Sequence, residues 1–288
     1  SYSGEGSSWL YVWEYSNNQW NNINSNFPYE LEDGEYEYAP PVLIGDTDSD
    51  GNAELVISNG EESLLWIEPE TAQNSTWSVG SVFPANYDWN LGQSFMVVVQ
   101  EGSTTKLITV GRDEYNSTNG YYATVCLNAG NNGSLLWATG VNQSQDSYGN
   151  IGGPAIGDVD GDSDLDVVNQ WIVSGSYHEG IIEYLTLSNG TRTTLTDVPH
   201  NEHCEDYAMS PMIIAGEDGS GLAVFGSTST VTHGSRYHSG SPEFIPGSSY
   251  WSEDRCPSTP VVGNLDGDSD LEVIFADDSG VLYALDMN

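Results

Sequence analysis

A short acidic segment occurs three times in this chain, each time between a glycine and an apolar run. The three copies read GDTDSDGNAELVIS, GDVDGDSDLDVV and GNLDGDSDLEVIF, and their loops begin at Asp46, Asp158 and Asn264. These loop starts are 112 and 106 residues apart, and half of such an interval is about 55 residues. A motif that recurs in one register indicates a repeated structural unit, with room for one degenerate copy between each pair of motifs.

The stretches between the three copies keep a pattern of short strands. One runs through FMVVVQ, KLITVG, YYATVCL and LLWATG, and another begins at SPMIIAGEDGSGLAVFG. β-Branched and aromatic runs alternate with Gly, Asn, Asp and Ser, and no long segment has a period of 3.6 residues. The pattern predicts an all-β repeat protein, and the repeat length favours a β-propeller of four-stranded blades.

We predict five blades in one domain that covers residues 1–288, with a truncated propeller of six or seven blades as the alternative. The last blade has only three recognisable strands, whereas SWLYVWEYSNNQW near the N-terminus has no partners of its own. An N-terminal segment that completes the last blade would leave no exposed sheet edge. The predicted blades lie near residues 41–93, 94–152, 153–209, 210–258, and 259–288 together with 1–30.

The acidic loops offer the ligands that Ca²⁺ prefers. Each places oxygen-bearing side chains at loop positions 1, 3, 5 and 9, and position 7 can offer its backbone carbonyl. Calcium takes roughly six to eight oxygen ligands, whereas Mg²⁺ demands a more rigid octahedron. We therefore predict about three structural Ca²⁺ sites. Their predicted ligands are Asp46, Asp48, Asp50, Asn52 and Glu54; Asp158, Asp160, Asp162, Asp164 and Asp166; and Asn264, Asp266, Asp268, Asp270 and Glu272.

Two other interpretations of these loops compete with a calcium site of this kind. An EF-hand is excluded because position 12, which would carry a bidentate glutamate, holds Ile57, Asn169 and Phe275, and a strand follows each loop. Solvated acidic turns in an acidic protein are the plainer alternative. Close like charges cost free energy without a cation, so three copies in one register favour metal binding.

The stretches PPVLIGDTDSDGNAELVIS, GPAIGDVDGDSDLDVVN and TPVVGNLDGDSDLEVIF resemble the FG-GAP and VCBS repeats of integrin α-chain propellers and of many secreted microbial proteins. Beyond these stretches the resemblance rests on strand spacing. It implies that each loop joins the first two strands of a blade and holds one structural Ca²⁺. Two features depart from the family pattern. Ser163 and Ser269 stand where such loops often carry glycine. Asn264 replaces the first aspartate of the third loop, which therefore has one charge fewer among its expected side-chain ligands, so we predict the weakest site there.

The charge balance restricts the partners of this chain. It has 43 acidic and 5 basic residues, a formal net charge of −38, and Lys106 as its one lysine. Such a surface repels nucleic acid and anionic membranes, so we expect neither as a partner. Most of the carboxylates lie outside the metal loops and are therefore expected at the solvated surface. Such a surface suits a protein in concentrated salt, where repulsion between its charges is screened. The charge balance therefore favours a halophilic archaeon or bacterium as the source.

The sequence also predicts an extracellular or cell-surface location. No apolar run approaches the roughly 18 residues of a membrane span, and the start SYSGEGSS lacks the basic and apolar regions of a signal peptide. We therefore expect targeting and anchoring segments to lie outside this chain. Five Asn-x-Ser/Thr sequons fit an exported glycoprotein, although chance supplies several in such a composition: Asn74, Asn116, Asn132, Asn142 and Asn189.

The cysteines and histidines give weaker predictions. Cys204 and Cys256 precede apolar strands in neighbouring repeats, so we predict a disulfide between them in an oxidising compartment. Cys126 has the pattern of a buried strand residue. His200 and His203 could bind zinc together with Cys204, but no second cluster has a standard spacing, and an ordinary polar loop is the preferred interpretation.

Three classes of function remain. A calcium-stabilised recognition or adhesion module that binds a glycan or a surface protein is favoured, because no compact catalytic group of residues is evident. Tyr87, Trp89 and Tyr148 could stack on sugars, although aromatic residues more often fill blade interfaces. The alternatives are a polysaccharide-active enzyme, either a lyase or a hydrolase, and a structural spacer in a larger surface protein. We predict no catalytic residue, and the net charge disfavours an acidic polymer as substrate.

Overall fold

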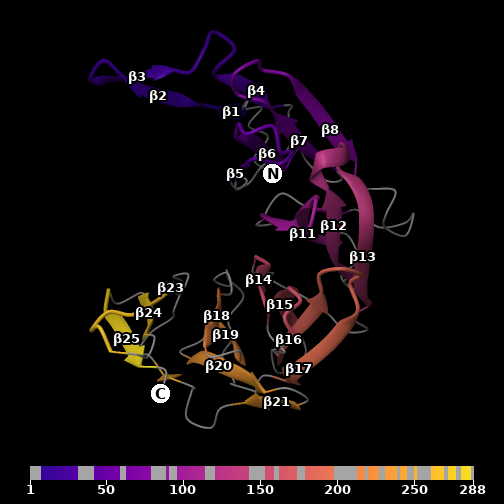
Figure 1. The fold of residues 1–288 in the computed structure, drawn as a ribbon, viewed down its shortest axis with the longest axis vertical. Coiled ribbons are helices and arrows are strands. Elements are labelled where there is room, and N and C mark those ends of the chain that lie inside the picture. Colours follow the sequence, from indigo (N-terminus) through magenta and orange to yellow (C-terminus); the bar gives the residue numbers. More distant parts are fainter. Residues whose placement is uncertain are drawn as a thin grey trace, which may run out of the picture. The chain divides into compact units, whose positions relative to one another are not determined.

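The computed structural model describes the chain mainly as β-strands, most of which are labelled in Figure 1. The described part contains one short 3-10 helix, η2 (Ala129–Asn131), and no α-helix. Nothing in that part is a helix with the length and apolar character needed to cross a membrane. The described residues are 8–31, 42–58, 63–78, 89–90, 96–113, 121–142, 153–158, 162–173, 179–197, 213–217, 220–226, 231–238, 241–244, 250–251, 261–268, 272–276 and 280–286.

In the described part of the chain, five sheets of three to five strands follow one another in sequence order (Figure 1). Apart from one short strand each in the second and fourth sheets, their strands pair with their sequence neighbours. The first contains β5 (Val42–Gly45), β6 (Glu54–Ser58), β7 (Ser63–Ile67) and β8 (Asn74–Ser78). The second contains β10 (Met96–Glu101), β11 (Thr104–Asp113), β12 (Tyr121–Asn128) and β13 (Ser134–Asn142), with β9 (Trp89–Asn90) beside β11. The third contains β14 (Ala155–Gly157), β15 (Asp166–Val173), β16 (Glu179–Thr186) and β17 (Arg192–Asp197).

The last two sheets continue the same order. The fourth contains β18 (Ile213–Glu217), β19 (Ser220–Gly226), β20 (Val231–His238) and β21 (Ser241–Phe244), with β22 (Tyr250–Trp251) beside β20. The fifth contains β23 (Val261–Gly263), β24 (Glu272–Ala276) and β25 (Leu282–Asp286). The predicted all-β fold with repeated four-stranded antiparallel sheets is therefore confirmed.

The chain divides into two compact units. The first is Ser1–Tyr115 with Cys126–Leu136, and the second is Asn116–Val125 with Trp137–Asn288. The first sheet belongs to the first unit, and the third to fifth sheets belong to the second unit. The number of blades, their boundaries and the assignment of residues 1–288 to one propeller domain stay predictions.

Apolar runs with β-branched and aromatic residues form the inner strands of the first sheet. All five residues of β6, ELVIS, are buried, which is the pattern of a central strand with both faces covered. In β8, NSTWS, only Trp77 is buried, as expected of an outer strand. Leu55 and Ile57 of β6 pack with Leu65 and Ile67 of β7, so the core of the first unit lies on this sheet.

The N-terminal strands pack on the same core. β1 (Ser8–Leu10) pairs with β4 (Tyr29–Leu31), and Leu10, Phe27 and Leu31 are buried in the cluster formed by β6 and β7. β2 (Trp13–Ser16) and β3 (Gln19–Asn22) form a hairpin whose turn residues, Asn17 and Asn18, have φ of 54° and 63°. Two consecutive left-handed residues are typical of the type I′ turn that closes such hairpins. Among the described residues, β1 to β4 pair with one another and pack on the first sheet, and none of them pairs with the sheet formed by residues 261–286, where the sequence predicted that the N-terminal segment completes the last blade.

A tryptophan packs on a hairpin glycine in each of two neighbouring pairs of sheets. Trp77 of β8 lies against Gly133, in the turn before β13, and Trp137 of β13 lies against Gly190, in the turn before β17. The indole Nε1 of Trp137 also donates to the backbone carbonyl of Leu187 (2.9 Å). Each pair joins the outer strand of one sheet to the turn that precedes the outer strand of the next.

Candidate metal centres

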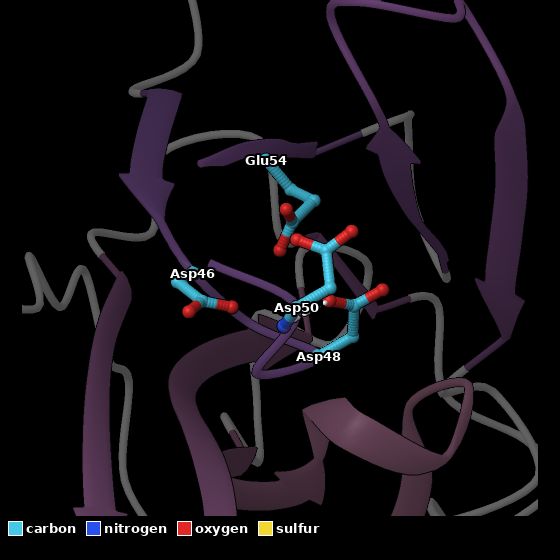
Figure 2. A group of neighbouring side chains, drawn as sticks. All are labelled: Asp46, Asp48, Asp50 and Glu54. Carbon is cyan, nitrogen blue, oxygen red and sulfur yellow. Dashed lines mark hydrogen bonds between the residues drawn. The ribbon is translucent and has the colours of Figure 1, made fainter. Parts of the chain in front are cut away.

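The first acidic loop connects β5 to β6 and begins at the ladder pair of Gly45 and Glu54. Figure 2 shows the side chains of Asp46, Asp48, Asp50 and Glu54, and one carboxylate oxygen from each lies within 4.8 Å of the others. Four carboxylates at this spacing repel one another strongly without a positive charge among them. The loop therefore has the donor set of a site for a hard divalent cation such as Ca²⁺.

Hydrogen bonds from the backbone hold the first loop in a tight curl. The two carboxylate oxygens of Asp46 accept from the backbone N–H groups of Ser49 (2.7 Å) and Gly51 (3.1 Å). Ser49 and Gly51 have φ of 68° and 96°, so the chain turns through two left-handed residues. The side chain at loop position 1 thus organises the backbone of positions 4 and 6.

The second loop repeats this backbone arrangement. The N–H of Ser163 donates to Oδ2 of Asp158 (2.9 Å), as Gly51 does to Asp46 in the first loop. The N–H of Asp164 donates to Oδ1 of Asp162 (2.8 Å), and the corresponding bond in the first loop, between positions 7 and 5, has the same length. Asp166, at position 9, is buried at the start of β15. The described residues of two loops from different sheets therefore share one conformation.

The residue at position 9 of the first loop is a fully buried glutamate. Oε2 of Glu54 accepts from the backbone N–H (2.6 Å) and the hydroxyl (2.7 Å) of Thr47, which is itself fully buried. The hydroxyl of Thr47 accepts in turn from Nε1 of Trp66 (2.8 Å). Oε1 of Glu54 is buried and has no hydrogen-bond partner. A buried carboxylate oxygen without a donor costs free energy, so the first loop fits a bound cation that this oxygen would help to hold.

The third loop uses its position-9 glutamate in the same way. Oε2 of Glu272 accepts from the backbone N–H of Leu265, seven residues earlier, as Glu54 accepts from Thr47. Glu272 is 7% exposed and pairs with Gly263 at the base of its ladder. The buried glutamate therefore anchors the start of the second strand in both sheets.

Three carboxylates meet in the third loop. Oxygens of Asp266, Asp268 and Glu272 lie within 4.8 Å of one another. Oδ1 of Asn264 accepts from the backbone N–H of Gly267 (2.6 Å), which has φ of 86°, while Nδ2 of Asn264 donates to the carbonyl of Asp268. Asparagine thus replaces the aspartate of the first loop as the organiser of the turn.

Several predicted residues lie outside the described part of the chain. The structure brings together the four acidic predicted ligands of the first loop and three in the third, and it describes four of the five in the second. The remaining predictions, among them the disulfide and the histidine cluster, stay predictions. The residues outside the described part are Asp160, Asp270, Ser269, Cys204, Cys256, His200, His203, Tyr87, Tyr148 and Asn116.

The prediction that Cys126 is a buried strand residue is confirmed. It lies in β12 with no exposed surface, and it is a free cysteine. Burial raises the pKa of its thiol to about 12. The thiol is therefore neutral at physiological pH, and Cys126 has a packing role rather than that of a nucleophile.

The left-handed serine in the second loop gives a testable prediction. Ser163 has φ of 76°, a conformation that is strained for every residue except glycine and, to a lesser degree, Asn and Asp. We expect Ser163→Gly to stabilise the protein by about 0.5–1 kcal/mol, since relief of strain exceeds the entropy that glycine adds to the unfolded chain. Urea unfolding with calcium present measures this change. Ser25→Gly, at an exposed bend without positive φ, is the control and should not stabilise.

Comparisons with known proteins support the fold. No family model matches the chain, and no curated protein matches it. The structure is similar to BBS1N in its complex with ARL6DN, with a TM-score of 0.51, 13% identity, and coverage of 98% of this chain and 73% of that one. It also matches Chaetomium thermophilum Raptor (TM-score 0.43, 13% identity, 85% and 20% coverage) and polysaccharide lyase Uly1 (0.42, 12%, 86% and 58%).

The repeated sheets and this likeness define the class of the protein. A meander of four strands, repeated along the chain with each loop in register, is the blade of a β-propeller. The chain is therefore a β-propeller protein, in which acidic loops join the first two strands of at least three sheets. At 13% identity, the likeness to BBS1N shows the fold alone.

Proposed function

We propose that this chain is a calcium-stabilised propeller of the FG-GAP and VCBS type that recognises a glycan outside the cell. The three acidic loops and their shared hydrogen bonds support a calcium role that is structural. The observation that carries the recognition function is a row of exposed aromatic side chains on the N-terminal hairpin. We call these four residues the aromatic strip: Tyr11, Trp13, Tyr15 and Trp20.

The aromatic strip lies in and beside the hairpin of β2 and β3. Tyr11 stacks on Trp13 with ring centroids 5.4 Å apart, and Tyr15 lies opposite Trp20 in the ladder with centroids 5.1 Å apart. Exposure rises along the strip from 51% at Tyr11 to 70% at Trp20. Exposed apolar groups that are gathered in this way usually mark a binding surface.

The charge near the aromatic strip favours a neutral ligand. In the segment 9–31 the charged residues are Glu14 and Glu30, although the whole chain has a net charge of −38. A surface for a cationic partner would concentrate carboxylates, and an anionic partner would meet the repulsion of the whole molecule. Exposed amides lie at the hairpin turn, and each offers both donors and an acceptor to hydroxyl groups: Asn17, Asn18 and Gln19. Flat rings beside amides suit the apolar faces and hydroxyls of a neutral sugar chain.

A polysaccharide-active enzyme is the second candidate. A polysaccharide lyase is among the structures that the chain matches, but a TM-score of 0.42 is too low to indicate a shared activity. Within the described residues, Lys106 is buried and forms an ion pair with Glu101 (2.5 Å), so it is poorly placed as a general base for a bound sugar. This placement of Lys106 is the reason that we propose binding ahead of catalysis.

A glycan panel tests the recognition function. We expect the folded protein to bind a neutral polysaccharide in high salt with calcium, and Trp13→Ala or Trp20→Ala to weaken that binding about tenfold or more, by analogy with stacking of bases on aromatic rings. Leu136→Ala, which removes another exposed apolar side chain, is the control and should bind like the wild type. The measurement is titration calorimetry.

Two results would count against glycan recognition by the aromatic strip. If both tryptophan variants bind the glycan as the wild type does, the ligand site does not lie on this hairpin. No binding to any neutral glycan, by protein shown to be folded with calcium, would favour a protein partner or a spacer role instead.

A further inference from the structure

An acidic residue outside the loop motif lies next to the first metal centre. Glu68 directly follows β7, one residue beyond the last ladder pair of Leu55 and Ile67, so the same antiparallel register extended by one residue sets it opposite Glu54. Glu68 is 7% exposed, and its Oε1 atom is buried without a hydrogen-bond partner. Like charges that face each other across a sheet are destabilising, so this pair needs a compensating positive charge.

The face of β7 on which Glu68 lies is turned toward the first loop. Glu68 is two residues after Trp66, and residues two apart along a strand lie on the same face. Nε1 of Trp66 donates to the hydroxyl of Thr47 in the first loop (2.8 Å). Glu68 therefore lies on the side of the strand that contacts the first metal centre.

Glu54 and Glu68 each present one buried carboxylate oxygen, Oε1, that has no donor. In the described part of the chain neither forms an ion pair with a lysine or arginine, because the ion pair found there joins Lys106 to Glu101. Desolvated carboxylate oxygens are costly, and a divalent cation bound between them would satisfy both at once. These orphaned oxygens are an observation separate from the clustering of the loop aspartates.

We propose that Glu68 is a further ligand of the cation in the first loop, supplied by the third strand of the sheet rather than by the loop motif. This inference rests on the calcium role proposed above. Glu54 then binds the cation from the second strand, Glu68 binds it from the third, and the loop aspartates supply the remaining side-chain ligands. The cation joins three consecutive segments of one sheet.

The position of Glu68 differs between the three metal loops. In the third sheet Asp166 pairs with Thr186, and in the fifth sheet Glu272 pairs with Asp286. The third strand thus carries a carboxylate residue at this register position beside the first and third loops, and a hydroxyl residue beside the second.

Terbium luminescence can measure the first loop separately. Nε1 of Trp66 donates to the hydroxyl of Thr47 within this loop, so Trp66 is positioned to transfer excitation energy to Tb³⁺ bound there. The other two loops are disabled in the full chain by Asp162→Asn and Asp268→Asn. A Trp66→Phe variant in this background identifies the signal that comes from the first loop.

We expect Glu68→Gln to weaken Tb³⁺ and competing Ca²⁺ binding at the first loop by about 10- to 100-fold, as loss of a residue that supports a metal site does. Glu30→Gln, which removes an exposed carboxylate on β4 outside this centre, is the control and should change affinity much less. The melting temperature in EDTA is the second readout. Glu68→Gln should melt no lower than the wild type there, because it removes an orphaned carboxylate, whereas general damage to the fold would lower it.

The possible outcomes separate this inference from the proposed calcium role. Wild-type affinity in Glu68→Gln, or equal losses in the two variants, would overturn the assignment of Glu68 and leave the calcium sites in place. Failure of the wild-type first loop to bind Tb³⁺ or Ca²⁺ at all would overturn both. Weaker binding in Glu68→Gln alone, with an unimpaired EDTA melt, supports Glu68 as a ligand.

Discussion

EDTA should lower the melting temperature of this protein by roughly 15–30 °C, and an excess of Ca²⁺ should restore it. A ligand that binds only the folded state, at a free concentration one hundred times its Kd, contributes about 2.7 kcal/mol, so three such sites contribute about 8 kcal/mol. For a chain of this size each kcal/mol corresponds to about 2–4 °C. Calorimetry or circular dichroism in matched high-salt buffers with EDTA, Ca²⁺ or Mg²⁺ measures the shift.

The calcium experiment has a variant that isolates one site. Asp50→Asn removes a carboxylate from the first loop and should lose about one third of the calcium-dependent shift. Recovery by Mg²⁺ as complete as that by Ca²⁺ would contradict calcium selectivity. A melting temperature that EDTA leaves unchanged would contradict structural metal binding altogether.

The first loop is also joined to the neighbouring sheet, so loss of its cation should have effects beyond the loop. The hydroxyl of Ser49 lies 3.1 Å from that of Thr105 on β11, which in turn donates to Oε1 of Gln100 (2.8 Å). At the start of the loop, a side chain at Gly45 would lie 3.0 Å from Val98 of β10. The curl that the cation fixes thus positions contacts between the first and second sheets. Unfolding in EDTA should therefore begin at this contact.

The sequence predicted the acidic loops well because their chemistry depends on local spacing. Alternate oxygen donors on one curled segment must keep their intervals, so Asp46, Asp48 and Asp50 are visible without any structure. The buried glutamate at position 9 is local in the same sense. Strand order followed as readily, because hairpin connections keep neighbouring strands adjacent in the chain.

The sequence did not reveal features that depend on pairing between strands. Glu68 is fourteen residues from Glu54 and meets it only through the register of β6 and β7, so no motif contains both. Its one local signal is an acidic residue directly after the apolar strand SLLWI. The aromatic strip gave a clearer signal, since tyrosine and tryptophan alternate before an Asn-Asn turn. From its pattern alone, however, this segment indicated only strands without partners of their own.

The packing of tryptophan on glycine was also hidden from the sequence, and it gives the second large expected effect. We expect Gly133→Ala to destabilise the protein by about 3–4 kcal/mol with calcium present. A Cβ at Gly133 would lie 2.4 Å from Cδ2 of Trp77, and the φ of Gly133 is 65°. Left-handed backbone costs a non-glycine residue roughly 1–2 kcal/mol, and forced overpacking adds about 1–3 kcal/mol.

Gly102→Ala separates the two contributions. Gly102 lies in the hairpin between β10 and β11 with φ of 60°, and a Cβ there would contact nothing within 4 Å. It should therefore cost only the backbone strain, about 1–2 kcal/mol. Denaturant unfolding compares the two variants. Equal losses would mean that the ring of Trp77 moves aside, and that the glycine is needed for its backbone alone.

A double-mutant cycle with Trp77→Ala then tests whether this contact joins the two sheets. A Cβ at Gly133 would also lie 2.5 Å from Cγ of Trp77, and alanine has no Cγ, so it leaves room for the new methyl group. Gly133→Ala should therefore cost no more than Gly102→Ala in that background, and the coupling energy should approach the overpacking cost of about 1–3 kcal/mol. Costs that simply add would show that Trp77 and Gly133 act independently. The equivalent cycle at Gly190 and Trp137 should give the same sign, because a Cβ at Gly190 would lie 2.7 Å from the ring of Trp137. Agreement between the two cycles would make the pair a repeated element of blade packing, independent of the calcium loops.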